Sequence, residues 1–140
     1  MKVLLAVDGS DYTKRMLEYL AGHDELLGPS HEYTALTVVT PIPPHAARHI
    51  ERTTLDGYYR DEATKVLDPV VAVAAKHGWN LTALFRPGHA AEEIAALAER
   101  DEYDLVVLGT HGHSALGSLV LGSVVSGVLA RAKKPILLVP

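Results

Sequence analysis

The stretch Lys2–Ser10, KVLLAVDGS, joins a short apolar run to an acid, a glycine and a serine. The run is almost continuously apolar, which is typical of a strand that is covered on both faces in the middle of a parallel sheet. Ser10 is a good helix N-cap, and after it Tyr12, Met16 and Leu20 recur at intervals of four, as one face of a helix requires. The stretch therefore predicts a central strand followed directly by an amphipathic helix.

The rest of the chain repeats this alternation of strand and helix. Helical spacing follows the first strand, runs through Ala63–His77, opens again at Glu92 and Glu93, and returns from about Ser123. Pro69 falls inside the second helical segment, where it predicts either a kink, which we favour, or a second short helix that begins at the proline. Short runs rich in Val, Leu, Ile, Thr or Tyr predict five strands: Lys2–Val7, Glu32–Val39, Asn80–Arg86, Tyr103–Gly109 and Pro135–Val139.

The order of these segments predicts the fold class. Regular alternation of strands and helices is typical of the α/β class, and right-handed crossovers favour a single doubly wound, five-stranded parallel sheet with about four helices on both faces. Both the flavodoxin-like and the Rossmann-like type fit this pattern. Thr40–Leu55 contains Pro41, Pro43 and Pro44 and is predicted to be a long loop, a kind of segment that often serves as a lid. Residues 1–140 are expected to form one domain.

Composition excludes several classes of function. The chain has no cysteine, so it has neither a disulfide framework nor a thiolate metal site. Its formal net charge is −4 and its basic residues are scattered, whereas nucleic-acid binding usually leaves a concentrated basic surface. No run approaches the ~18 apolar residues of a membrane helix, and the short apolar run at the start is not that of a signal peptide. We therefore expect a cytoplasmic protein that binds neither nucleic acid nor membrane.

A glycine-rich segment follows the fourth predicted strand, from Gly109 through Gly112 to Gly122 and Ser123. In a doubly wound sheet the ligand crevice lies beyond the carboxyl ends of the strands where the strand order reverses, which for the order 3-2-1-4-5 is between strands one and four. Glycines present successive N–H groups to an anion, and a helix that starts at Ser123 adds its N-terminus. Asp8 ends the first strand and is a candidate partner for a ribose or for a phosphate-bound Mg²⁺. Taken alone, the segment also fits a glycine-rich turn with a serine cap.

The motifs of several other nucleotide-binding and hydrolytic proteins are missing. The sequence has no GxxxxGK[ST] segment, no GxGxxG after the first strand, and no GxSxG elbow. P-loop, dinucleotide-binding and α/β-hydrolase chemistry are therefore not indicated.

The spacing of the glycines resembles the nucleotide signature of the universal stress protein family, which is Gly, two residues, Gly, nine residues, Gly, then Ser or Thr. Val3–Ser10 is similar to the opening strand of that family, and Gly88–Ile94 is similar to the turn before its third helix. The resemblance covers essentially all 140 residues. It implies a sheet of order 3-2-1-4-5 and, in the ATP-binding branch of the family, a nucleotide in the predicted crevice.

The resemblance also implies roles for individual residues. Asp8 would meet the ribose or the metal, and the backbone of Val38 would meet adenine. His111 stands where many relatives carry arginine or another residue, which is a departure from the pattern. The complete implied binding set is Asp8, Val38, Gly109, Gly112, His113, Gly122, Ser123 and Val124.

From these features we expect a binding module whose conformation or assembly responds to ATP with Mg²⁺. Two alternatives stay open: an interaction protein that binds no nucleotide, and a slow ATPase or phosphotransferase, for which only His111 or His113 would replace the usual lysine or arginine. We expect a homodimer, partly from the family, because Pro135–Val139 would be an apolar edge strand that a second copy can pair. Thr40–Leu55 follows the strand that would contact adenine, so we expect it to lie over the nucleotide and to be ordered by it.

Overall fold

The computed structural model describes residues 1–112 and 121–140. Within these residues the strands form one sheet in the order β3-β2-β1-β4-β5, and each neighbouring pair runs parallel. The predicted fold class and the 3-2-1-4-5 order are thereby confirmed. The strands are β1 (Lys2–Ala6), β2 (Glu32–Val39), β3 (Asn80–Pro87), β4 (Leu105–Gly109) and β5 (Ile136–Val139).

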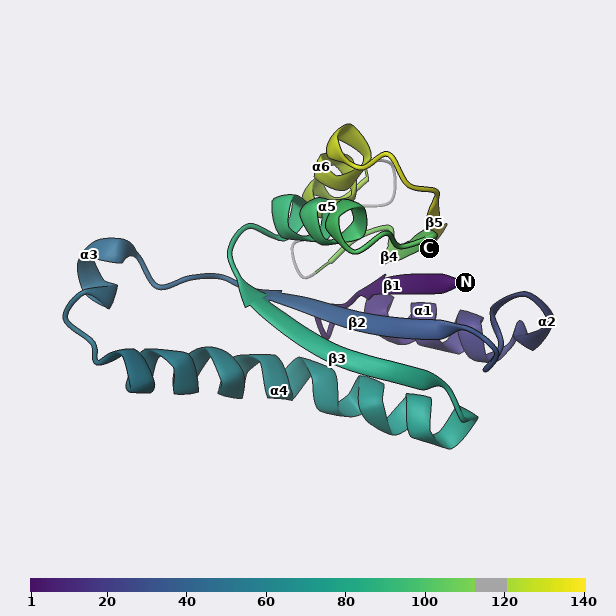
Figure 1. The fold of residues 1–140 in the computed structure, drawn as a ribbon, viewed down its shortest axis with the longest axis horizontal. Helices are drawn as coiled ribbons and strands as arrows, with labels where there is room; N and C mark the ends of the chain where they lie inside the picture. Colours follow the sequence, from purple (N-terminus) through teal and green to yellow (C-terminus); the bar gives the residue numbers. More distant parts are fainter. Residues whose placement is uncertain (113–120) are drawn as a thin grey trace.

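Six helices accompany the sheet in the described residues, where about four were expected. The helices α1 and α4 pack on one face of the sheet, and α5 and α6 pack on the other (Figure 1). The additional helices, α2 and α3, have four residues each. Within the described ranges, no helix combines the length and the apolar character needed to cross a membrane. The helices are α1 (Asp11–Ala21), α2 (Asp24–Leu27), α3 (Pro44–Ala47), α4 (Arg52–His77), α5 (Ala90–Arg100) and α6 (Ser123–Arg131).

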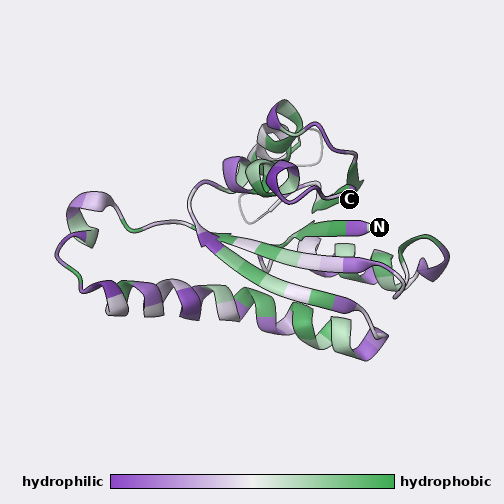
Figure 2. Ribbon diagram, viewed as in Figure 1, coloured by the Kyte–Doolittle hydropathy of each residue, from purple (hydrophilic) through white to green (hydrophobic). Residues whose placement is uncertain are grey.

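The sheet separates two apolar clusters. In β1, Val3 and Leu5 pack with α1 and α4, whereas Leu4 packs with α5 and α6. Successive side chains of a strand point to opposite faces, which explains why this segment is apolar without interruption. All three side chains are fully buried, and each contributes about 2 kcal/mol relative to an exposed position. Figure 2 shows the hydrophobic colouring of β1 between the two helical layers.

The interpretation of Thr40–Leu55 as a loop is wrong in two places. Pro44 begins the short helix α3, at a position where the missing N–H of proline is tolerated. The long helix α4 begins already at Arg52. The first buried side chain of α4 is that of Tyr59, because the turns before it project beyond the sheet (Figure 1). No apolar stripe marks those turns in the sequence, so helical spacing alone did not indicate them.

The helix α4 continues through Pro69 as one element of 26 residues. The alternative of a second short helix that begins at Pro69 is therefore wrong, while the kink stays a prediction. A proline inside a helix removes one backbone hydrogen bond. Leu67 and Val70, on either side of the proline, are buried in the cluster below the sheet, and this packing stabilises the helix across the missing bond. The helix ends at Gly78, which has a φ of 69°.

Candidate functional site

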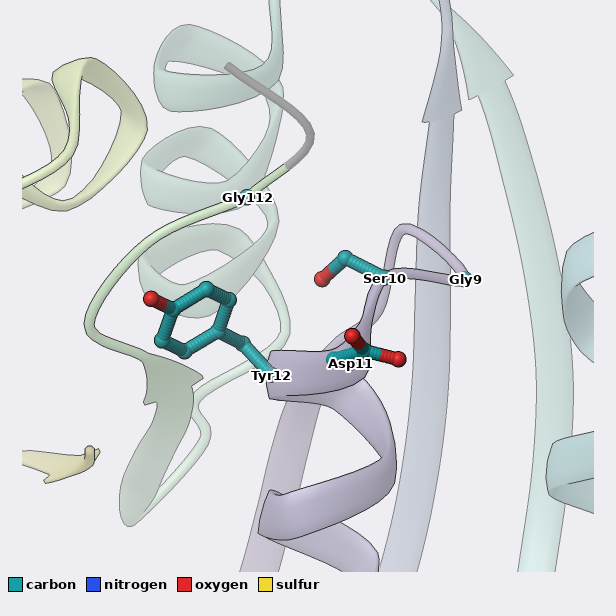
Figure 3. Close-up of a pocket in the computed structure, with 5 residues that line it drawn as sticks. All are labelled: Gly9, Ser10, Asp11, Tyr12 and Gly112. Atoms are coloured by element: carbon teal, nitrogen blue, oxygen red, sulfur yellow. The ribbon is translucent and has the colours of Figure 1, made fainter. Parts of the chain in front are cut away.

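The carboxyl ends of β1 and β4 lie where the strand order reverses. From β1 the chain crosses to β2, and from β4 it crosses to β5 on the opposite side of the sheet. The two connections diverge, so this edge is the expected position of a ligand crevice. A pocket of about 290 Å³ opens there, as Figure 3 shows. It is lined by Gly9, Ser10, Asp11, Tyr12 and Gly112.

Asp8 follows β1 and is held by the first turn of α1. Its carboxylate oxygen Oδ1 accepts a hydrogen bond from the Ser10 N–H at 2.9 Å and another from the Thr13 hydroxyl at 3.0 Å. The same Thr13 hydroxyl oxygen accepts the N–H of Asp8 at 3.0 Å. Gly9 makes the turn between them with a φ of 78°, which glycine adopts without strain. Both the backbone and the carboxylate of Asp8 are thus positioned by residues close in sequence.

Gly112 lies directly opposite this carboxylate. A Cβ atom built on Gly112 would stand 2.5 Å from Oδ2 of Asp8, well inside van der Waals contact. Only glycine fits here while the carboxylate keeps its position. Figure 3 shows Gly112 on the segment after β4, across the pocket from Ser10. The structure therefore brings together two residues that are 104 positions apart and were both predicted to bind nucleotide.

Tyr12 occupies the space between the start of α1 and the end of β4. A Cβ atom on Gly109 would stand 2.7 Å from the Cβ of Tyr12, so the glycine permits the close approach of α1. The rings of Tyr12 and His111 have centroids 5.2 Å apart, and the Arg15 guanidinium lies 5.1 Å from the centroid of the Tyr12 ring. His111 Nδ1 is 3.1 Å from the Thr110 hydroxyl. An aromatic ring with basic neighbours therefore borders the pocket.

The start of α6 lies against the residues that follow β4. Gly122 is the N-cap of α6, and its N–H donates to the Thr110 carbonyl at 3.0 Å. A Cβ atom on Gly122 would stand 3.2 Å from the Cα of His111, so a larger residue would push the two backbones apart. Ser123 is exposed at the first position of α6, and Val124 packs against the cluster between α5, α6 and the sheet. A helix N-terminus, with its unpaired amides, is thus joined to the crevice.

Val38 lies near the end of β2, beyond the end of β1. The Leu36 carbonyl accepts the N–H of Val7, so the backbone groups of Leu36 face β1, whereas the Val39 carbonyl accepts the N–H of Gly88 on the β3 side. Backbone groups of alternate residues face the same side of a strand. The N–H and C=O of Val38 therefore face the side on which β1 has already ended, which is the side of the crevice.

Most of the residues predicted from the sequence meet at this edge of the sheet, and His113 lies outside the described residues. Sequence reasoning missed Tyr12 as a pocket residue, because its spacing with Met16 and Leu20 made it look like a core position. It also missed Thr13, which is only 7% exposed. The sequence signal for Thr13 was its polar hydroxyl on the apolar face of the predicted helix, about one turn after Asp8.

The residues present fit a magnesium ion only in company with a phosphate chain. Among the described residues there is no group of three or more His, Asp or Glu side chains arranged to hold a metal. Mg²⁺ in nucleotide sites commonly has one or two carboxylates, phosphate oxygens and waters as ligands. The carboxylate of Asp8 suits that arrangement, in which the phosphates bring most of the ligands.

Comparison with known proteins relates the whole chain to one family. A model of the universal stress protein family matches residues 1–140. A universal stress protein of Synechocystis is 31% identical over 136 residues, which are 97% of this chain but 41% of that protein. One from Thermus aquaticus is 32% identical over 137 residues, which are 98% of this chain and 96% of that protein. The chain thus spans less than half of the first relative and nearly all of the second.

Two solved structures share the fold. The universal stress protein from Archaeoglobus fulgidus in complex with dAMP has a TM-score of 0.71 and 19% identity, over 100% of this chain and 98% of that chain. A universal stress protein family protein from Arabidopsis thaliana with AMP bound has a TM-score of 0.70 and 18% identity, over 99% and 90% of the two chains. Since the family model matches from the first residue to the last, the chain belongs to the universal stress protein family.

Proposed function

We propose that the protein binds ATP together with Mg²⁺ in the crevice between β1 and β4. The contact between Asp8 and Gly112 carries this proposal. A fixed carboxylate faces a backbone that has no side chain, at the edge where doubly wound sheets bind ligands. A phosphate chain needs such bare backbone for its N–H contacts, and a nucleotide-borne cation needs such a carboxylate.

The order of the groups around the crevice suits the three parts of an adenine nucleotide. The backbone of Val38 supplies a donor and an acceptor for adenine, and Asp8 accepts from ribose or holds the metal. The backbone of the glycines and the start of α6 would then bind the phosphates. Two proteins of the same fold are described with dAMP and AMP, which supports an adenine nucleotide as the ligand class. The residues in the proposed phosphate region are Gly109, Gly112, His113, Gly122, Ser123 and Val124.

The proposed output is a change of conformation or assembly rather than rapid turnover. Phosphoryl transfer usually depends on a lysine or arginine beside the γ-phosphate. The segment 109–123 contains neither. A ligand shifts a protein between two states by binding one of them more tightly, and this requires no chemistry. We therefore assign the protein a nucleotide-responsive regulatory role.

The first test is calorimetry on the full chain with Mg-ATP, Mg-ADP and AMP. Asp8→Asn keeps the oxygen that accepts from Ser10 and Thr13 but removes the charge, so ATP affinity should fall by about tenfold or more. Asp68→Asn, at an exposed position of α4, is the matched control and should bind like the parent. A parent protein that binds none of the three nucleotides would overturn the proposal and favour an interaction protein.

We further propose a homodimer in which β5 is the contact. It is the edge strand of the sheet, and Ile136, Leu137 and Leu138 are each only partly buried. An apolar edge of this kind is normally covered, and a second copy can cover it about a two-fold axis. Sizing at tens of micromolar should give a dimer, and Leu137→Lys should give a monomer whose circular dichroism is unchanged. A strictly monomeric parent would contradict the assignment.

A further inference from the structure

Thr13 is a polar residue on the buried face of α1. The residue is 7% exposed and lies on the same face as the buried residues Met16, Leu17 and Leu20. An apolar residue would suit this position, because a buried hydroxyl is unfavourable unless it is hydrogen-bonded. The Thr13 hydroxyl makes two hydrogen bonds, both with Asp8: it donates to Oδ1 and accepts the backbone N–H. The polar group of Thr13 therefore serves to bind Asp8.

These bonds determine how the carboxylate group is oriented at the crevice. Oδ1 accepts from Thr13 and from the N–H of Ser10, so it points into the turn. Oδ2 consequently points across the crevice, where the Cα of Gly112 leaves room for it. Rotation of the carboxylate would break two hydrogen bonds to a charged acceptor, each of the stronger kind.

We propose that Thr13 is a positioning residue for the nucleotide, which acts by holding the Asp8 carboxylate in its binding orientation. This inference rests on the proposed function and adds a residue to it. We assign Thr13 no direct contact with the ligand, because little of the residue is exposed and its hydroxyl is bonded to Asp8. Thr13 restricts rotation of the Asp8 carboxylate, so that ligand binding does not have to restrict it.

The decisive variant is Thr13→Val, which has nearly the same shape but no hydroxyl. Asp8 then loses both bonds to Thr13 and keeps the one from the Ser10 N–H. We expect the affinity for Mg-ATP to fall by about tenfold, the effect of one hydrogen bond to a charged group. Thr13→Ser restores the hydroxyl and should bind within about threefold of the parent.

A matched control separates positioning from loss of stability. Thr34 is 8% exposed, and its hydroxyl oxygen accepts a hydrogen bond from the Tyr103 hydroxyl at 2.8 Å, in the cluster on the opposite face of the sheet. Thr34→Val also removes a buried threonine hydroxyl and should lower the melting temperature by a similar amount. It should leave the affinity for Mg-ATP unchanged.

The double variant Asp8→Ala, Thr13→Val tests whether Thr13 acts through Asp8, because alanine leaves no side-chain oxygen for Thr13 to hold. If it does, Thr13→Val has no further effect once the carboxylate is gone, and the two losses do not add. Thr13→Val that binds like the parent, or that costs the same tenfold in the Asp8→Ala background, would overturn the inference while the proposed function stands. A parent that binds no nucleotide would overturn both.

Discussion

Gly127 lies on α6 where that helix packs against Ala91 of α5. A Cβ atom built on Gly127 would stand 2.5 Å from the Cβ of Ala91, whereas two carbon atoms prefer a separation of about 3.5–4.0 Å. Gly127→Ala must therefore move α6 away from α5 by about 1 Å. Overpacking of this kind costs about 1–3 kcal/mol, and the better helix propensity of alanine offsets about 1 kcal/mol of it. We expect the free energy of unfolding to fall by about 1 kcal/mol.

Gly57 provides the control, because it is also inside a helix but has no described atom within 4 Å of its added Cβ. Gly57→Ala should raise the free energy of unfolding by about 0.5–1 kcal/mol, since only helix propensity changes. Urea unfolding of both variants should show changes of opposite sign in the free energy of unfolding. Adding Ala91→Gly to Gly127→Ala should relieve the contact. If Gly127→Ala stabilised the protein as much as Gly57→Ala does, the packing of α5 against α6 described above would be refuted.

Three further expectations concern the site and the core. Gly112→Ala places a methyl group 2.5 Å from Oδ2 of Asp8, so calorimetry should show a loss of Mg-ATP affinity of about tenfold or more; unchanged affinity would remove Gly112 from the site. Chelation of Mg²⁺ should weaken ATP binding and leave AMP binding unchanged, because the ion needs a phosphate chain; an equal loss for both nucleotides would contradict this. Burial, with the nearby charge of Asp24, raises the pKa of Tyr33 to about 12. The folded chain then keeps a proton that the unfolded chain loses near pH 10.0, so stability should fall as pH rises from 10 towards 12, and urea unfolding of Tyr33→Phe should show less of this fall than the parent.

Much of the fold follows from local pattern. The five strands were predicted because each is a short apolar run between turn residues, although β4 begins at Leu105 rather than at Tyr103. The start of α4 was not predictable in the same way, because its first turns, as far as the structure describes their surroundings, contain no buried side chain and carry no apolar stripe. The prolines at 41, 43 and 44 also concealed the short helix Pro44–Ala47, since proline usually breaks a helix but is accepted in its first turn.

The site was predictable where it depends on backbone and topology. Glycine spacing and strand order together indicated that Asp8 and Gly112 would share an edge of the sheet. Thr13 and Tyr12 were not predicted, because their roles depend on which face of α1 meets the end of β4, and helical spacing only classifies that face as buried. Ser10 occupies the predicted N-cap of α1, yet its side chain makes no capping bond. The turn is held by Asp8 and Thr13 instead.

The division of the core by the sheet has a consequence for how the crevice can evolve. One wall, from Asp8 to Tyr12, leads into α1, whose buried residues belong to one apolar cluster, while the other wall leads into α6, whose buried residues belong to the second. Among the described residues the two clusters share no member. Volume changes that accumulate on one face therefore shift one wall and leave the other in place. Repacking the helices on one face would in this way change the width of the crevice without replacing any residue that lines it.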